Sequence, residues 1–258
     1  MRKACSVVVK GMVTVLFAQG LLSLPGCQKD DQPPTQQTIV LHIDTVLVPP
    51  NAVADVSGNI YSTIHIGSQR WMAGNLRTSH YSNGDPIPYV PDGTEWTSLT
   101  TGAWSNYDCD AAYDVLYGKL YNWYTVSDSR NVCPAGWHVP TDADWMEMEQ
   151  VLGVTVSDLD NTGSRGVAAN AGGQMKADGL WNSPNTGATD SSGYSAFPSG
   201  QRSLGGIFNN IGTKGHWWSI SEYDTDMGWL RELSYNNAGI YRLYNYKTLG
   251  LSIRCVED

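Results

Sequence analysis

Alternating hydrophobic and polar residues along short stretches of the chain predict β-strands. In residues 58–66, three isoleucines fall on one face of an expected strand and the residues between them fall on the other. Gly67 and Ser68 then suit a two-residue type II′ turn, because glycine takes the positive φ that this turn requires. The pattern therefore predicts a β-hairpin whose return strand carries Trp71.

Four stretches near the C-terminus predict a second group of strands. They are short, rich in aromatic and β-branched residues, and separated by segments that contain glycine, asparagine or aspartate. The last three stretches are spaced as an antiparallel meander requires. The four stretches are residues 217–221, 228–235, 240–246 and 251–257.

Residues 141–153 predict a short helix with recognisable signals at both ends. Thr141 precedes the helix and Asp144 follows three residues later, which is the spacing of a capping box. Gly153 is placed to end the helix in the left-handed conformation. Between these signals runs an apolar stripe at helical spacing, made of Trp145, Met148, Val151 and Leu152.

A second helix is predicted for residues 114–126, although Gly118 weakens its first turn. The stretches 79–106 and 157–216 have little periodicity and contain glycine, proline, serine or asparagine every few positions. We expect them to be long ordered loops held to the core by isolated large apolar side chains. These anchors are Trp96, Trp104, Met175, Trp181, Phe197 and Phe208.

The composition agrees with one sizeable core built from short strands and ordered loops. The chain has 258 residues, of which 41% are hydrophobic, and its 27 glycines and 12 prolines favour short strands and loops over a helical bundle. The formal net charge is −9. Nucleic acid is therefore not an expected partner, because phosphate binding requires a basic surface that this composition does not supply.

The N-terminal region divides into an export signal and a tether. Residues 1–26 have a positively charged start and an apolar segment that is too short to span a bilayer. Residues 24–27 resemble a bacterial lipobox, with Pro25 as a departure, and this resemblance implies that Cys27 is acylated. Residues 27–54 are then an acylated N-terminus and tether, and residues 55–258 are the domain. Ordinary signal cleavage, with no role for Cys27, remains the alternative.

Residues 28–31 resemble the signal of one lysine and two acids that directs lipoproteins to the cell surface in Bacteroidetes-type bacteria. The resemblance implies an outer-membrane lipoprotein that is exposed at the cell surface and attached to the membrane through its N-terminal lipid. The same pattern also suits a solvated tether with no targeting role.

Three cysteines remain after the signal and Cys27 are set aside. Outside the cytoplasm one pair can oxidise, which leaves one cysteine over. In the last predicted strand Cys255 falls on the same face as two core residues, so it points inward. We therefore expect a disulfide between Cys133 and Cys255, with Cys109 left over.

Several stretches together resemble the Fibrobacter succinogenes major paralogous domain, in family order, from about residue 55 to residue 258. The resemblance covers roughly four fifths of the chain and does not supply an activity. The matching stretches are GNIYSTIHIGSQRWMAGNLR, YGKLYNWYTV, CPAGWHVPTDADW, FPSGQRSLGGIFNNIG, WWSISE, LSYNNAGI and GLSIRCVED.

That family is similar to the C-type-lectin-like fold in the version shared with formylglycine-generating enzymes. The resemblance implies an α+β domain of two short helices and small twisted antiparallel sheets that carry long ordered loops. The enzymes require a working cysteine pair, which a structural Cys133–Cys255 disulfide would not supply. His138 and the other histidines are scattered, and no catalytic motif is present, so we expect no enzymatic activity.

Two groups of residues are candidate ligand sites. Asp108 and Asp110, and likewise Asp224 and Asp226, place carboxylates two residues apart; no cofactor is required, but this spacing is compatible with a structural Ca²⁺, and turn formation is the alternative. The second group is aromatic and would form a stacking platform for sugar. It consists of Tyr241, Tyr244 and Tyr246, with Trp229 nearby.

The sequence thus predicts a surface-displayed, lipid-anchored binding or adhesion module that is not an enzyme. Its expected partners are the membrane, through the lipid, and a glycan or surface protein. The alternative is a structural component of the envelope or of a pilus tip that contacts protein only.

Overall fold

The computed structural model describes residues 48–258, which form an α+β domain with more strand than helix. Within this range no helix is long and apolar enough to cross a membrane. The predicted signal peptide, Cys27 and most of the tether lie outside the described residues. The helices are α1 Gly93–Thr97, α2 Asp114–Tyr117, α3 Trp123–Val126, α4 Asp142–Val151 and α5 Ala171–Met175, with 3₁₀ turns at Tyr107–Cys109, Ala111–Tyr113 and Val156–Asp158.

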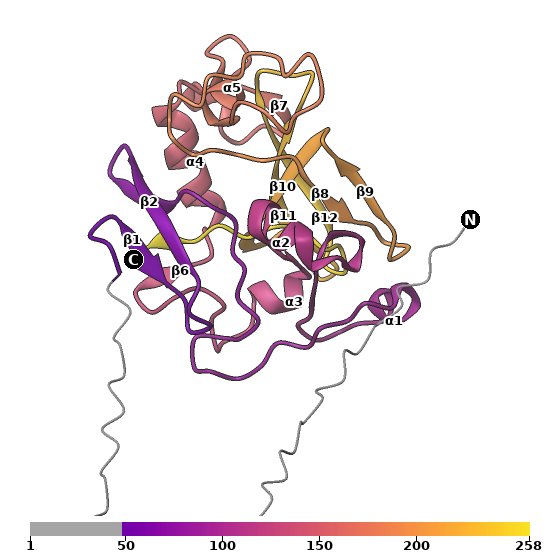
Figure 1. The fold of residues 1–258 in the computed structure, drawn as a ribbon. Coiled ribbons are helices and arrows are strands. Elements are labelled where there is room, and N and C mark those ends of the chain that lie inside the picture. Colours follow the sequence, from indigo (N-terminus) through magenta and orange to yellow (C-terminus); the bar gives the residue numbers. More distant parts are fainter. Residues whose placement is uncertain (1–47) are drawn as a thin grey trace, which may run out of the picture. The chain divides into compact units, whose positions relative to one another are not determined.

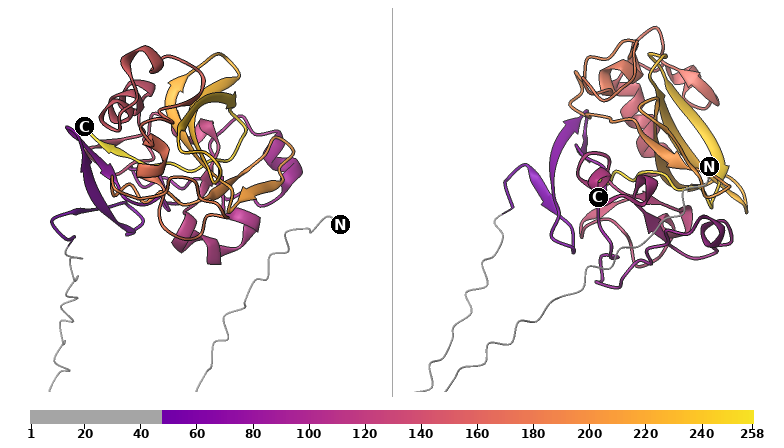
Figure 2. Two further views of the ribbon diagram at one scale, coloured as in Figure 1. Left: turned by 90° about the horizontal axis from the view of Figure 1, so that it is seen from above. Right: turned by 45° about the vertical axis from the view of Figure 1, so that its right-hand side comes forward.

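Thirteen strands of the described domain form three sheets, drawn in Figures 1 and 2. The sheet orders are β1-β2-β3-β13-β6, β7-β12-β11-β10-β8-β9 and β4-β5. The strands are β1 Ala52–Ala54, β2 Ile60–Ile66, β3 Gln69–Met72, β4 Trp104–Ser105, β5 Leu120–Tyr121, β6 Trp137–His138, β7 Gly163–Arg165, β8 Ser199–Arg202, β9 Phe208–Ile211, β10 Lys214–Glu222, β11 Met227–Ser234, β12 Ile240–Tyr246 and β13 Val256–Glu257.

The predicted hairpin is present as β2 and β3. Gly67 has a φ of 62°, and Ile66 pairs with Gln69 across the two-residue turn. β1 adds to the edge of β2, so the sheet already includes residues that the sequence assigned to the tether. β13 pairs with β3 on one side and β6 on the other, which places the end of the chain beside the hairpin (Figure 1).

The predicted meander of the last three strands is only partly present. β10, β11 and β12 are antiparallel neighbours, but the last stretch does not pair with β12. Ser252 forms a parallel bridge to Trp217 of β10, and only Val256–Glu257 form a strand, in the first sheet. Leu251, Ile253 and Cys255 are fully buried, and so are Ser252 and Arg254 between them. A segment that is buried on both sides runs through the core instead of lying at a sheet edge.

Helix α4 has the predicted cap. The Thr141 hydroxyl accepts a hydrogen bond from the Asp144 amide, and the Asp144 carboxylate accepts one from the Thr141 amide at 2.8 Å. The predicted apolar stripe is wrong at Val151, which is 53% exposed. Glu149 takes its place on the buried face, because it lies one turn after Trp145.

The predicted helix at 114–126 is wrong. The chain forms two single turns, α2 and α3, with the short strand β5 between them. Gly118 has a φ of 72°, and a Cβ atom there would lie 2.7 Å from the Asn75 side chain, so the backbone leaves the helix at this glycine. Asn122 then caps α3 by accepting a hydrogen bond from the Thr125 amide.

The core consists of two large apolar clusters. One contains the disulfide with Trp137, Trp218 and Leu230, and the other surrounds Trp71, Trp145 and Trp217. Adjacent tryptophans of β10 therefore enter different clusters, as the alternation of a strand requires. In Figure 2 the indigo hairpin and the orange and yellow sheet lie on opposite sides of the described domain, with helices and magenta segments between them.

Buried cations hold the long loops in place. The Lys176 ammonium donates to the carbonyls of Thr186, Ser234 and Asn237 at 2.7–3.0 Å. Arg202 donates to the carbonyls of Val90, Pro91 and Gly206, and Arg254 to those of Tyr194 and Ser195. Burial lowers the pKa of Lys176 to about 8 and that of Arg202 to about 10. Irregular segments leave carbonyls without sheet partners, and these side chains satisfy several of them.

Candidate functional site

The tyrosines of β12 divide between the two faces of the sheet. Tyr244 and Tyr246 are 39% and 47% exposed, and they share a face with Trp229 on β11, which lies directly opposite Tyr244. Tyr241 lies on the other face, because it is an odd number of residues away, and its hydroxyl accepts a hydrogen bond from Asn237 at 2.9 Å. The predicted platform is therefore wrong in including Tyr241.

Tyr223 completes the aromatic group that the sequence predicted only in part. Its ring is parallel to that of Tyr244, with the ring centroids 3.7 Å apart, and it meets Trp229 edge to face at 5.0 Å. Trp229 also meets Tyr244 edge to face at 5.6 Å. We call the group Tyr223, Trp229, Tyr244 and Tyr246 the aromatic surface.

Tyr223 was missed because it follows the strand pattern of β10 by one residue. The sequence signal that could have placed Tyr223 is the short connection between β10 and β11, which folds Tyr223 back over β11. The Tyr223 amide donates to the Met227 carbonyl at 2.9 Å. The hydrogen bond with Tyr244 raises the pKa of Tyr223 above its usual value. The aromatic surface is thus uncharged and partly apolar, with donors and acceptors at the ring edges.

A buried cluster of charges lies beside the aromatic surface, on the same face of the sheet. The Arg242 guanidinium lies 3.6 Å from the centre of the Trp229 ring and contacts both Asp142 oxygens at 2.7–3.1 Å. The Arg231 guanidinium forms ion pairs with Asp142 at 2.7 Å and with Glu149 at 2.5 Å, and so links the two carboxylates. Arg165 donates to the second oxygen of Glu149. We call these five residues the charge cluster.

The charge cluster fixes α4 against β7, β11 and β12. Glu149 is fully buried and Arg231 is 1% exposed. Burial raises the pKa of Asp142, but hydrogen bonds and charge from Arg242 and Arg231 outweigh this and leave the pKa below its usual value. Three guanidinium groups face two carboxylates, and Arg242 holds the Trp229 ring in place.

The predicted cation loops form turns. The Asp224 carboxylate accepts hydrogen bonds from the amides of Asp226 and Met227 at 2.9 and 2.8 Å. Asp110 caps the following 3₁₀ turn through the Ala112 amide. Among residues 48–258, no three histidine, cysteine or acidic side chains come close enough together to hold a metal ion.

The predicted disulfide is confirmed. Cys133 and Cys255 are bonded, with their Cα atoms 5.9 Å apart, and both are fully buried. Cys109 is not left over: its sulfur lies 3.5 Å from the Pro91 carbonyl, and it makes a further interaction in the structure. None of the three sulfurs lies in the aromatic surface.

His138 lies between two carboxylates. Its ring nitrogens contact Asp258 at 2.7 Å and Asp144 at 3.2 Å. The hydrogen bond to Asp144 raises the pKa of His138, and partial burial opposes it. The imidazole therefore links the C-terminal residue to the start of α4.

The family model described as the Fibrobacter succinogenes major domain matches residues 64–257. No curated protein and no solved structure matches the chain.

Proposed function

The chain belongs to the Fibrobacter succinogenes major domain family, and from that premise we propose that it is a lipid-anchored, surface-displayed binding module without catalytic activity. The observation that carries the proposal is the aromatic surface. Tyr223, Tyr244 and Tyr246 are each between 39% and 47% exposed. Tyr223 and Tyr244 are held by stacking on each other and by contact with Trp229, which the charge cluster holds through Arg242. Exposed aromatic groups with fixed geometry are typical of recognition surfaces.

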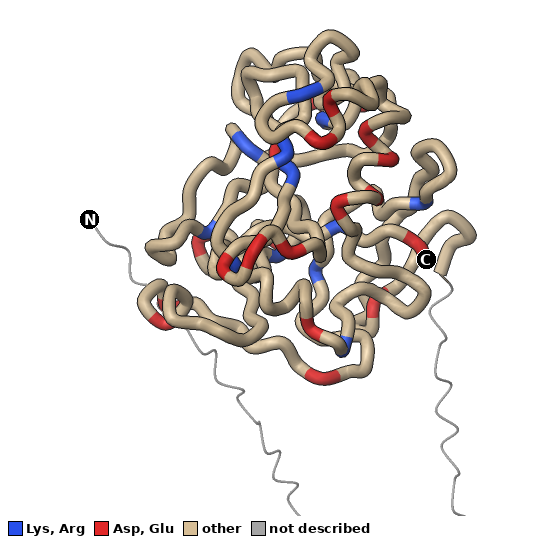
Figure 3. The backbone as a smooth tube through the Cα atoms, turned by 180° about the vertical axis from the view of Figure 1, so that it is seen from behind, with Lys and Arg blue, Asp and Glu red and all other residues tan. Residues whose placement is uncertain are grey.

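The ligand that suits this surface best is a glycan. A sugar ring has an apolar face that stacks on an aromatic ring, and hydroxyls that bond to the tyrosine oxygens and to polar neighbours. Basic and acidic residues are interspersed along the described backbone, as Figure 3 illustrates. This distribution supports excluding nucleic acid as a partner.

A glycan array tests the proposal. The Tyr223→Ala/Tyr244→Ala variant should lose binding to the array, while its thermal midpoint changes little because both rings are half exposed. The matched control is Tyr241→Ala, on the same strand but the opposite face, which should keep binding. If the control and the double variant weaken binding equally, the aromatic surface is not the site.

The alternative is a structural envelope or pilus-tip component that contacts protein only. The exposed tyrosines would serve a protein interface equally well, because tyrosine is enriched at such interfaces. Capture of one envelope protein by the wild-type chain but not by the double variant, together with no binding to the array, would establish this alternative.

The proposal that the module has no catalytic activity can be tested separately. The cysteine pair of the core is oxidised to a disulfide, so it does not supply the working thiols that formylglycine-generating enzymes require. Glycans bound on the array should be recovered unchanged after long incubation. Release of a shorter or modified product would contradict this part of the proposal.

The lipid anchor is proposed from Cys27, which lies outside the described residues. Cys27→Ser should move the protein from the membrane to the soluble fraction and abolish labelling with palmitate. Replacing Lys29, Asp30 and Asp31 with alanine should keep the protein in the outer membrane but protect it from protease added outside the cell. Unchanged fractionation of Cys27→Ser would contradict lipid anchoring.

We also infer that the α+β domain is a version of the C-type-lectin-like fold. Support comes from β13, which returns the end of the chain to the sheet of the N-terminal hairpin, and from the long loops between the sheets. An experimental structure compared with C-type lectins and formylglycine-generating enzymes tests this. A different order of the corresponding strands would overturn it.

A further inference from the structure

The connection between β10 and β11 places two aspartates beside the aromatic surface. Asp224 directly follows Tyr223 in the chain. The carbonyl of Asp226 accepts a hydrogen bond at 2.9 Å from the amide of Lys247, the residue after Tyr246. Both aspartates are exposed. This connection therefore brings two negative charges next to the exposed tyrosines.

A third aspartate approaches the aromatic surface from the segment before β7. The carbonyl of Asp160 accepts a hydrogen bond from Arg242 at 2.8 Å, and the same guanidinium lies 3.6 Å from the centre of the Trp229 ring. Asp160 is also exposed. Within residues 48–258, the carboxylates of Asp160, Asp224 and Asp226 form no ion pair.

The basic side chains beside the aromatic surface do not offset these charges. Arg242 is 7% exposed and pairs with Asp142. Lys247 is 6% exposed, and its ammonium group pairs with Glu222. The uncompensated charge next to the aromatic surface is therefore negative, which favours a cationic ligand and disfavours an anionic one.

The aromatic rings supply a second attraction for a cation. The face of a tyrosine or tryptophan ring attracts an ammonium or guanidinium group, as the contact of Arg242 with Trp229 illustrates. Tyr223 and Tyr244 stack on each other and are still 42% and 39% exposed, so a ligand can reach them from solvent. The hydrogen bond with Tyr244 is the main cause of the raised pKa of Tyr223, and the negative charge of Asp224 raises this pKa further.

We propose that the aromatic surface selects glycans that carry free amino groups, such as chains of glucosamine. The sugar ring stacks on an exposed tyrosine, while its ammonium group pairs with one of the three aspartates. The inference rests on the proposed glycan-binding function and names the ligand class of the same site.

A lysine-rich peptide is the competing ligand class. The ammonium group of lysine ends a flexible four-carbon chain, and fixing that chain costs conformational entropy. An amino sugar carries its ammonium group directly on the ring that stacks, so one rigid unit makes both contacts. The amino sugar therefore suits a fixed aromatic surface better.

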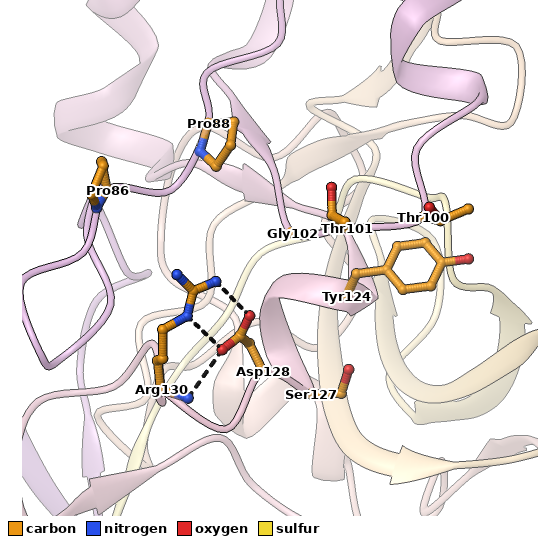
Figure 4. Close-up of a pocket in the computed structure, with 9 residues that line it drawn as sticks. All are labelled: Pro86, Pro88, Thr100, Thr101, Gly102, Tyr124, Ser127, Asp128 and Arg130. Atoms are coloured by element: carbon orange, nitrogen blue, oxygen red, sulfur yellow. Dashed lines mark hydrogen bonds and ion pairs between the residues drawn. The ribbon is translucent and has the colours of Figure 1, made fainter.

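An aromatic ring also lies beside an acid in a pocket of about 410 Å³ next to α3, which Tyr124 and Asp128 line. There, Arg130 donates to both oxygens of Asp128 at 2.8 and 2.7 Å, as the dashed lines in Figure 4 show. Because a cation of the protein already compensates this carboxylate, the pocket attracts an ammonium group less. Tyr124 therefore provides a control for binding at this competing position.

Isothermal titration calorimetry of the full-length chain with matched trisaccharides tests the inference. The trimers of glucosamine, N-acetylglucosamine and glucose share one linkage, and only the first is cationic. The glucosamine trimer should bind roughly three- to tenfold more tightly than the neutral trimers, as one cation–π contact and one exposed ion pair predict. This preference should shrink in about 1 M salt, because salt screens exposed charges.

The variant Asp160→Asn/Asp224→Asn/Asp226→Asn removes the three charges with little change of shape. An asparagine at position 224 can still accept the hydrogen bonds of the turn. In this variant the glucosamine trimer should bind no more tightly than the neutral trimers. A preference that survives the three substitutions would overturn the inference.

Two control variants should keep the preference. Asp178→Asn removes an exposed charge two residues after Lys176, which binds the Ser234 carbonyl at the far end of β11. Tyr124→Ala removes the ring of the pocket beside α3. Loss of the preference in Tyr124→Ala would place the amino sugar in that pocket and overturn the inference.

The outcomes separate this inference from the proposed function. If the neutral trimers bind as tightly as the glucosamine trimer and binding depends on Tyr223 and Tyr244, the inference fails and the proposed function stands. Tighter binding of a trilysine peptide than of the glucosamine trimer also overturns the inference, and so does a preference that persists in Tyr223→Ala/Tyr244→Ala. Absence of any glycan binding overturns both.

Discussion

At the scale of single residues, the candidate site illustrates what alternation along a strand can and cannot predict. Trp229, Tyr244 and Tyr246 were identified from the sequence, and strict period-two alternation would already have excluded Tyr241. Tyr223 could not be placed, because its stacking on Tyr244 depends on how the β10–β11 connection folds back. The role of Arg242 could not be predicted from the sequence either, since its partner Asp142 lies 100 residues away along the chain.

The charge cluster gives the first prediction. Arg231→Met should lower the free energy of unfolding by roughly 3–5 kcal/mol, because Glu149 and Asp142 would lose a buried partner. The matched control is Arg70→Met, whose contact with Glu257 is partly exposed and should cost less than about 1 kcal/mol. Urea denaturation measures both. Equal losses in the two variants would contradict the role assigned to the cluster.

A second prediction concerns Lys176. Lys176→Met keeps most of the volume but leaves three loop carbonyls without a donor, at a cost of roughly 2–3 kcal/mol. Hydrogen exchange should increase first near residues 186 and 234–237. Lys214→Met serves as the control, because this lysine is 38% exposed at its side chain and pairs only with Glu232 among the described contacts. Unchanged exchange in the Lys176 variant would show that the loops are held by other contacts.

At the scale of elements, the sequence predicted correctly those helices and strands whose local sequence signals are complete. The β2–β3 hairpin has a matching strand pattern and turn, and α4 has its capping box, so both were predicted correctly. The 114–126 helix failed because apolar spacing was accepted across Gly118, which is forced out of the helix by close contact with Asn75. The crossing of residues 251–255 between sheets depends on long-range pairing that no local pattern contains.

The disulfide gives a prediction at this scale. It spans 122 residues of sequence, and removing a cross-link over such a loop costs on the order of 4–5 kcal/mol in the chain-entropy account. Cys133→Ala/Cys255→Ala should lower the free energy of unfolding accordingly. Amides of residues 253–257 should lose protection from hydrogen exchange before those of the β2–β3 hairpin.

Two measurements control for the effect of the alanines themselves. The wild-type chain under reducing conditions should show the same order of exchange, since it lacks the cross-link but keeps both sulfurs. Mass spectrometry of a non-reduced digest should recover a peptide joining Cys133 to Cys255. Recovery of either cysteine joined to Cys109 would contradict the pairing.

At the scale of the whole domain, β13 and the residues around it are tied to the β2–β3 hairpin and to the middle of the domain. β13 inserts between β3 and β6, the disulfide joins Cys255 to Cys133, and the last residue, Asp258, binds His138. His138 in turn binds Asp144, which caps α4. Titration of this contact should therefore be visible in the stability of the domain.

The direction in which this contact changes stability with pH follows from the shifted pKa values of His138 and Asp144. The pKa of His138 is raised above 6.5 in the folded state, so its contribution is fully present below about pH 6.5 and is lost as the pH rises through the folded value. Burial raises the pKa of Asp144, but hydrogen bonds from His138 and Thr141 outweigh it and leave the pKa below 3.8. The contribution of Asp144 is present above about pH 4 and is lost on further acidification.

The final prediction is a pH window for the contact. The thermal midpoint of the wild type should exceed that of His138→Gln most between about pH 4 and about pH 6.5, and the difference should shrink on either side. The effect should correspond to less than about 1 kcal/mol, because the imidazole and Asp258 are partly exposed. Thermal scans of both proteins across this range measure it. A difference that does not change with pH would mean that His138 acts through packing, and that the C-terminus is held by β13 and the disulfide alone.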